Sequence, residues 1–140
     1  MGESLESISF RKKEFTPIPL EDLQNAMIEK GIDTLRKMHQ KHKGITVMPI
    51  TDNSYRILFL NLFSEQNKPG MLAIAEMYES DFPLSALPKY FRGRALQVNE
   101  KPNEAKEYFK KCLELISNDI SLSPGEKEAY TNRCESLLKG

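Results

Sequence analysis

The two histidines are the residues in this sequence best suited to bind a metal ion. His39 and His42 stand three positions apart, so a helix would place both imidazoles on one face, which we expect to be exposed near a helix end. Zinc would need further ligands, and no nearby carboxylate completes the set. Positively charged side chains interact favourably with the C-terminal end of a helix, and this would account for two histidines at that position without a metal. We therefore predict no metal site and no cofactor.

The candidate nucleophiles lack the partners that catalysis requires. A catalytic serine or cysteine is activated by a histidine, which a carboxylate in turn orients. The sequence has no G-x-S-x-G motif and no P-loop. Cys112 and Cys134 are its only cysteines, and neither has a partner at metal-binding spacing. We expect both to be small buried hydrophobic residues, and we predict that this chain alone is not an enzyme.

The charge balance argues against two classes of partner. The 140 residues include 20 basic and 20 acidic ones, and the basic clusters at 11–13 and 36–43 are short. Proteins that bind nucleic acid or anionic membranes depend on larger clusters of Lys and Arg. No apolar run reaches the roughly 20 residues of a membrane span. We see no signal peptide, and Glu6 breaks the myristoylation pattern. These features favour a cytoplasmic protein that binds neither nucleic acid nor membrane.

Hydrophobic spacing predicts about six helices joined by short turns, with no strand-rich segment. Residues 1–18 form a mixed N-terminal arm, and a single helical domain follows over 19–140. Its first helix, 20–43, carries apolar side chains at steps of three and four residues. Gly31 interrupts this stripe, and Gly44 is the expected end of the helix.

Capping residues predict where the later helices begin. Asp52 or Asn53 can cap one helix, Asn67 the next, and Ser85 the one after that. The stretch S-P-G-E combines a capping box with a proline at the first helical position. It therefore predicts a last helix over 123–139.

Two helix–turn–helix segments repeat with a period of 34 residues, over 52–85 and 86–119. They resemble the tetratricopeptide repeat, whose pattern is W-x2-L-G-x2-Y, then A-x3-F, then P. The first segment matches that pattern at Tyr55, Leu58, Leu62 and Pro83 and departs from it at Phe59 and Met71. The second matches it at Gly93, Leu96, Ala105 and Phe109 and departs from it at Lys89, Arg92 and Ser117.

This resemblance implies an all-α fold in which helix pairs stack into a right-handed superhelix. The helix over 20–43 would precede the array, and the helix over 123–139 would cap it. In such repeats, small residues let the paired helices approach closely. Phe59, which stands where glycine is usual, therefore implies a wider first pair.

The resemblance also implies a concave surface that binds a protein or peptide partner through the first helix of each pair. The residues implied are Asn53, Arg56, Leu60, Phe63, Leu87, Tyr90, Arg94 and Gln97. Arg56 and Arg94 would hold a carboxylate bidentately, and Tyr90 would pack against a peptide side chain. The alternative is an ordinary solvated face, or a groove already covered by the helix at 20–42.

Two further interpretations remain open. Residues 44–97 are similar to the C-terminal extension of some bacterial α/β-hydrolase-type esterases, which implies an accessory domain for an esterase encoded in the same or a neighbouring chain. Two repeats are also fewer than a stable array usually needs. The spare apolar edge would then be covered by the N-terminal helix or by a second copy in a homodimer.

Overall fold

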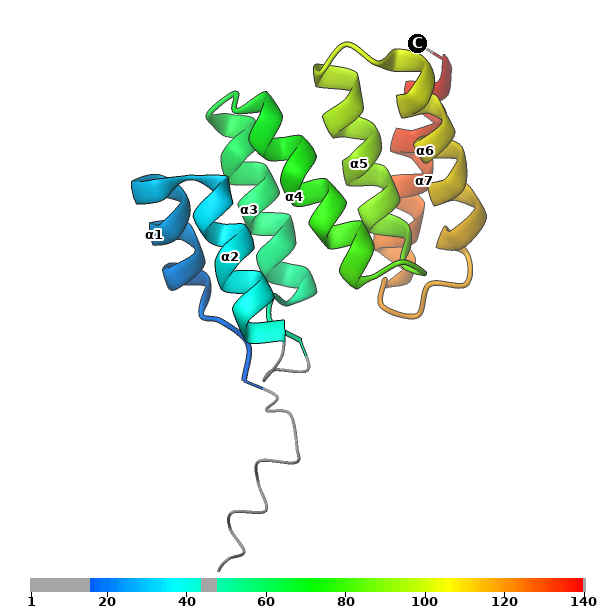
Figure 1. Ribbon diagram of the computed structural model, residues 1–140. Helices are drawn as coiled ribbons and strands as arrows, with labels where there is room; N and C mark the ends of the chain where they lie inside the picture. The colour runs from blue at the N-terminus through cyan, green and yellow to red at the C-terminus, as the bar shows by residue number, and fades with distance from the viewer. Residues whose placement is uncertain (1–15, 44–47, 140) are drawn as a thin grey trace, which may run out of the picture. The chain divides into compact units, whose positions relative to one another are not determined.

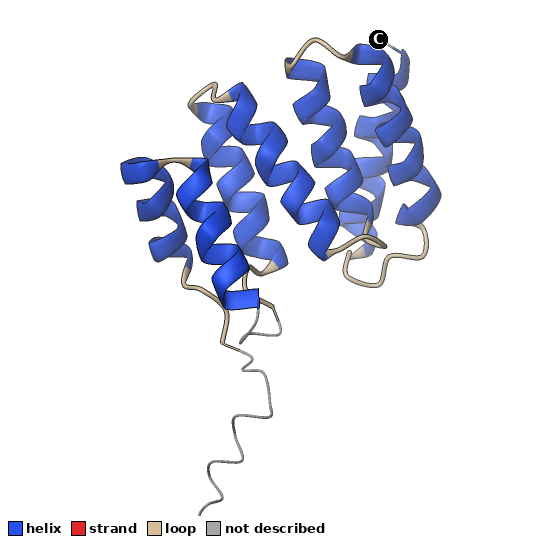
Figure 2. Cartoon of the chain, viewed as in Figure 1, coloured by secondary structure: helices blue, strands red, loops and turns tan. Residues whose placement is uncertain are grey.

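The computed structural model describes residues 16–43 and 48–139, which form seven α-helices and no strand (Figure 2). The all-α prediction is confirmed for this part of the chain. None of these helices combines the length and apolar character that crossing a membrane requires. The chain divides into two compact units, residues 1–54 and 55–140.

The N-terminal unit contains a hairpin of two helices, α1 (Leu20–Lys30) and α2 (Ile32–Lys43) (Figure 1). The predicted single helix over 20–43 is therefore wrong. Gly31 separates the two helices with φ 86° and ψ −174°, a conformation that is essentially restricted to glycine. Its N–H donates to the carbonyl oxygens of Ala26 and Met27, each at 3.1 Å. The apolar stripe consequently folds back on itself instead of continuing along one helix.

The hairpin and the segment that follows it share a small core. Leu23 of α1, Leu35 of α2 and Ile50 are fully buried. His39 is also buried, at 5% exposure, which corrects the expectation that it lies on an exposed face. The expected helix end at Gly44 and most of the predicted arm over 1–18 lie outside the described residues.

Helix α3 (Asp52–Ser64) begins in the N-terminal unit and continues into the C-terminal one. Its start is capped by Thr51, whose Oγ1 accepts a hydrogen bond from the Ser54 N–H at 3.1 Å. The prediction that Asp52 or Asn53 provides this cap is wrong, because both residues already lie within the first turn.

The C-terminal unit holds the rest of α3 and four further helices: α4 (Lys68–Asp81), α5 (Ala86–Val98), α6 (Pro102–Ile116) and α7 (Pro124–Lys139). Successive helices run antiparallel, so α3–α4 and α5–α6 are hairpins and α7 packs against α6 (Figure 1).

The turns of these two hairpins have the same backbone geometry at positions 34 residues apart. Gln66 and Glu100 both adopt the left-handed conformation, with φ of 57° and 62°. The next residue then donates its N–H to a carbonyl oxygen at 2.9 Å, in the pairs Asn67–Leu62 and Lys101–Leu96. The period seen in the sequence is thus matched by equivalent turns.

Two of the predicted helix caps are confirmed. The Asn67 Oδ1 accepts a hydrogen bond from the Gly70 N–H at 3.0 Å at the start of α4. At the start of α7, the Ser123 N–H donates to Glu126 Oε1 at 3.0 Å, and the Glu126 N–H donates to Ser123 Oγ at 3.2 Å. This reciprocal pair is the expected capping box.

The predicted cap of α5 is wrong. The Ser85 side chain makes no capping hydrogen bond. Instead, the Ala86 N–H donates to Asp119 Oδ2 at 2.8 Å. Asp119 follows α6 and is buried, so a carboxylate distant in sequence caps α5 and ties the α4–α5 and α6–α7 connections together.

The close packing of α5 against α6 depends on Gly93. A Cβ atom at this position would lie 2.5 Å from Cε1 of Phe109, which is fully buried. Cys112 of α6 and Cys134 of α7 are both buried free cysteines, as predicted. A hydrogen bond with Cys134, together with burial, raises the pKa of the Cys112 thiol, so Cys112 stays protonated and acts as a packing residue.

Candidate functional site

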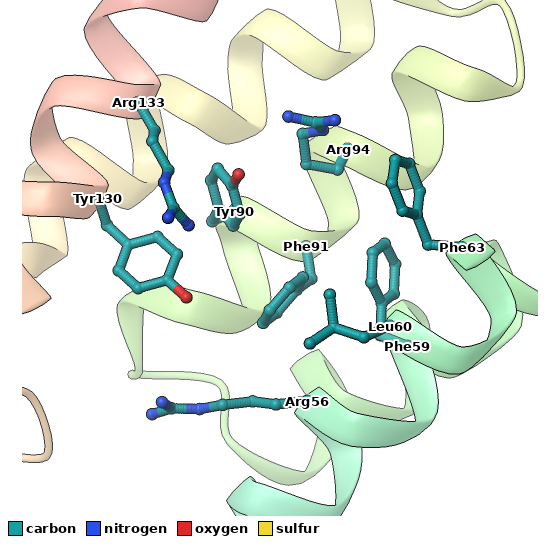
Figure 3. Close-up of a pocket in the computed structure, with 9 residues that line it drawn as sticks. All are labelled: Arg56, Phe59, Leu60, Phe63, Tyr90, Phe91, Arg94, Tyr130 and Arg133. Carbon is teal, nitrogen blue, oxygen red and sulfur yellow. The ribbon is translucent and has the colours of Figure 1, made fainter.

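A groove of about 420 Å³ lies within the C-terminal unit, between α3, α5 and α7 (Figure 3). Each helix contributes residues three or four positions apart, which share one face of a helix. The α3–α5–α7 groove is lined by Arg56, Phe59, Leu60 and Phe63 of α3, Tyr90, Phe91 and Arg94 of α5, and Tyr130 and Arg133 of α7.

Aromatic rings form the floor of the groove. Phe59 and Phe91 are buried, with ring centroids 4.8 Å apart. Tyr90 is also buried and meets Tyr130 edge to face at 5.0 Å. These contacts join all three helices, so the floor is a packed and preformed surface.

Two apolar side chains of α3 remain open to solvent at the groove. Leu60 is 55% exposed and Phe63 is 42% exposed, whereas neighbouring Phe59 is only 3% exposed. Single exposed apolar residues are common, but adjacent ones beside a concave surface are typical of interaction sites. In Figure 3 both side chains lie on the α3 side of the groove, next to Phe59.

Three arginines surround the apolar floor, and no lining residue is acidic. Arg56 pairs with Glu126 of α7, with Nη1 and Oε2 3.3 Å apart. The Arg94 guanidinium lies 5.7 Å from the centroid of Phe63, and that of Arg133 lies 4.9 Å from the centroid of Tyr130. Within the described residues, neither Arg94 nor Arg133 has a carboxylate at ion-pair distance.

Glu126 connects the last helix to the groove. One carboxylate oxygen accepts the Ser123 N–H of the capping box, and the other pairs with Arg56. The hydrogen bond from the Ser123 backbone, assisted by Arg56, lowers the pKa of Glu126 below its ordinary value. Glu126 therefore stays ionised near neutral pH and balances the charge of Arg56, leaving Arg94 and Arg133 as the uncompensated cations of the groove.

The structure brings together most of the residues expected on the concave surface. Five of them line the groove: Arg56, Leu60, Phe63, Tyr90 and Arg94.

The other three predicted site residues lie elsewhere. Leu87 is buried at 1% exposure, so a partner cannot reach it and its prediction as a contact is wrong. Gln97 lines a separate hollow of about 260 Å³, bounded by residues such as Phe109 and Leu137. Asn53 is an exposed residue in the first turn of α3, on the N-terminal unit's side of the division.

Four lining residues were missed by the sequence reasoning. Phe59 and Phe91 are buried residues that also line the groove, so their apolar character alone does not distinguish them from core residues. Tyr130 and Arg133 stand three positions apart on α7, and that spacing is the signal that could have placed them on one face. The predicted carboxylate-binding pair is Arg56 and Arg94, whereas in the structure Arg56 pairs with Glu126.

The two histidines occupy different environments. His39 is buried, and His42 is half-buried with its Nδ1 2.9 Å from the Met38 carbonyl oxygen. Over residues 16–43 and 48–139, no three side chains of the His, Cys, Asp and Glu types converge as a metal site would require.

Comparisons with known proteins return nothing for this chain: no family model matches it, and no curated protein or solved structure is significantly similar to it.

Proposed function

We propose that the chain is a non-catalytic interaction module of tetratricopeptide-repeat-like helix pairs, which binds a protein or peptide segment in the α3–α5–α7 groove. The repeat interpretation is supported by the equivalent hairpin turns at Gln66 and Glu100 and by their 34-residue spacing. It is also supported by Gly93, which lets α5 and α6 approach closely.

The observation that carries the proposal is the combination of a preformed aromatic floor with exposed apolar side chains. Binding sites for peptides need apolar surface that is accessible before the partner arrives, together with a few polar groups that orient it. Leu60 and Phe63 supply the accessible surface, and the guanidinium groups supply the polar groups. The floor is fixed by ring contacts between helices, so little conformational entropy is lost on binding.

A peptide-display selection tests this function. The chain is presented to a library of random decapeptides, and recovered peptides are measured by fluorescence anisotropy against variants of the groove. The double variant Leu60→Ser/Phe63→Ser removes the exposed apolar surface of the groove. The matched control is Leu84→Ser/Ile120→Ser, which removes apolar residues that are 83% and 99% exposed outside the groove.

The proposal expects the groove variant to weaken binding at least tenfold and the control to leave it within twofold. Such a loss corresponds to removal of a few apolar contacts at the centre of a small interface. Peptides that bind both double variants as tightly as the unmodified chain would contradict the proposal, as would a selection that recovers no binder.

A further inference from the structure

The charges of the groove indicate what kind of segment it binds. Arg94 and Arg133 come from different helices and lie on either side of the Tyr90 ring in Figure 3. Building on the function proposed above, we propose that the occupant is an internal peptide segment in which two carboxylate side chains bracket an apolar one. The carboxylates pair with Arg94 and Arg133, and the apolar side chain lies over Tyr90 and Leu60.

The first argument is local charge. The chain as a whole has a formal net charge of zero, yet the groove lining contains three arginines and no acidic residue. Glu126 offsets Arg56, which leaves an excess of two positive charges beside apolar walls. A concave surface with walls of low dielectric concentrates such a field, so anionic groups are favoured there.

The second argument is the orientation of the two guanidinium groups. Arg94 lies over Phe63, and Arg133 lies over Tyr130. A guanidinium that stacks on a ring keeps its edge of N–H donors free and loses less rotamer freedom when it binds. That donor edge fits a carboxylate bidentately. Two such groups on separate helices suit two separate carboxylates.

The third argument favours a peptide over a nucleic acid. A bound strand presents regularly spaced phosphates, and its affinity comes from many basic contacts along the groove. Here only two uncompensated cations are present among the lining residues, and the groove between them is apolar. An apolar side chain between two acids fits that pattern.

The test uses the peptides recovered by the display selection, resynthesised with an amidated C-terminus and a neutral dye. The proposal expects acidic residues on both sides of a leucine, isoleucine or aromatic residue. Arg94→Gln and Arg133→Gln should each weaken binding about tenfold, consistent with loss of one charge-assisted pair. The matched control is Lys110→Gln, which removes the same charge from the outer face of α6 and should change binding less than twofold.

Two further arms sharpen the result. Arg94→Lys keeps the charge but loses the donor fork, so its binding should fall between that of the unmodified chain and that of Arg94→Gln. Glu126→Gln keeps a residue suited to the capping box and removes the negative charge beside Arg56, so an acidic peptide should bind two- to fivefold more tightly. Circular dichroism of each variant confirms that the helices are intact.

The possible failures are distinguishable. One outcome is that the selected peptides lose affinity for Leu60→Ser/Phe63→Ser but are neutral or basic. Another is that they bind Arg94→Gln and Arg133→Gln as tightly as the unmodified chain. Either outcome would overturn the inference and leave the proposed function standing. Absence of any groove-dependent peptide would overturn both. A single-stranded oligothymidylate or inorganic phosphate that displaces the acidic peptide at equal concentration would assign the arginines to phosphate and also overturn the inference.

Discussion

Replacing Gly93 with alanine should destabilise the C-terminal unit, although alanine is the better helix former. The added Cβ would lie 2.5, 2.8 and 3.0 Å from three ring atoms of Phe109. The ring is fully buried, so it cannot move aside without disturbing its neighbours. Overpacking of this kind costs typically 1–3 kcal/mol, and three close contacts to one ring place this site at about 3 kcal/mol.

The gain in helix propensity partly offsets this cost. Alanine is favoured over glycine by about 1 kcal/mol inside a helix, so the net loss in the free energy of unfolding should be about 2 kcal/mol. Gly125→Ala on α7 is the matched control, since nothing lies within 4 Å of its added Cβ. That control should be neutral or gain up to about 1 kcal/mol.

Urea denaturation followed by far-ultraviolet circular dichroism measures both variants. The double variant Gly93→Ala/Phe109→Leu should recover part of the loss, because the smaller side chain makes room for the new methyl group. If Gly93→Ala proved as stable as Gly125→Ala, α5 and α6 would not be in the close contact described here, and the argument for a packed helix pair would be refuted.

Three other substitutions probe the fold by the same denaturation assay. Gly31→Ala should lower the free energy of unfolding by about 1–3 kcal/mol, because the backbone conformation of Gly31 is essentially restricted to glycine even though there is open space around it. An unchanged urea midpoint would contradict that conformation. Tyr55→Phe should lower the free energy of unfolding by about 1–3 kcal/mol, because the Tyr55 hydroxyl donates a hydrogen bond to Asp81 Oδ2 at 2.5 Å. An unchanged free energy of unfolding would argue against this bond. Burial alone would raise the pKa of Asp119, but hydrogen bonds led by the one from Ala86 outweigh it and lower that pKa. A lowered pKa means that Asp119 adds stability above about pH 4 and loses it as the pH falls further. The Asp119→Asn variant should therefore be less stable than the unmodified chain at neutral pH, and its free energy of unfolding should fall less steeply as the pH is lowered. If the two chains lost stability equally in acid, the lowered pKa of Asp119 would be contradicted.

The features that could be predicted from the sequence are local ones. The capping box at Ser123 and the cap at Asn67 involve residues within one turn of each other, so their spacing alone determines the contact. The same holds for the helical stripes and for the 34-residue period. The buried state of Cys112 follows from its place in an apolar stripe of α6.

The features that were missed depend on tertiary contacts. The sequence predicts one helix that Gly31 interrupts at a cost in stability, but the chain reverses at Gly31, with Leu23 and Leu35 buried on the two helices of the hairpin. Ser85 is a residue type that often caps helices, yet the N–H at the start of α5 donates to the Asp119 carboxylate, which follows the C-terminal end of α6. No local pattern contains that information.

The candidate site was predicted in part for the same reason. The resemblance to the tetratricopeptide repeat implied that the first helix of each pair faces the partner, and Tyr90, Arg94 and Leu60, which were named on that basis, do line the groove. The rotation of α7, which brings Arg133 to the groove, follows from the packing of Cys134 in the core. The identity of the uncompensated arginines therefore needed the three-dimensional structure.

The most direct test of the groove as the binding surface is a nuclear magnetic resonance titration of the isotope-labelled chain with a selected acidic peptide. We predict that the largest shifts occur at the Leu60 methyls, the Phe63 ring and the guanidinium signals of Arg94 and Arg133. Shifts confined to the separate hollow at Gln97, or to the outer face of α6 around Tyr108, would contradict the account.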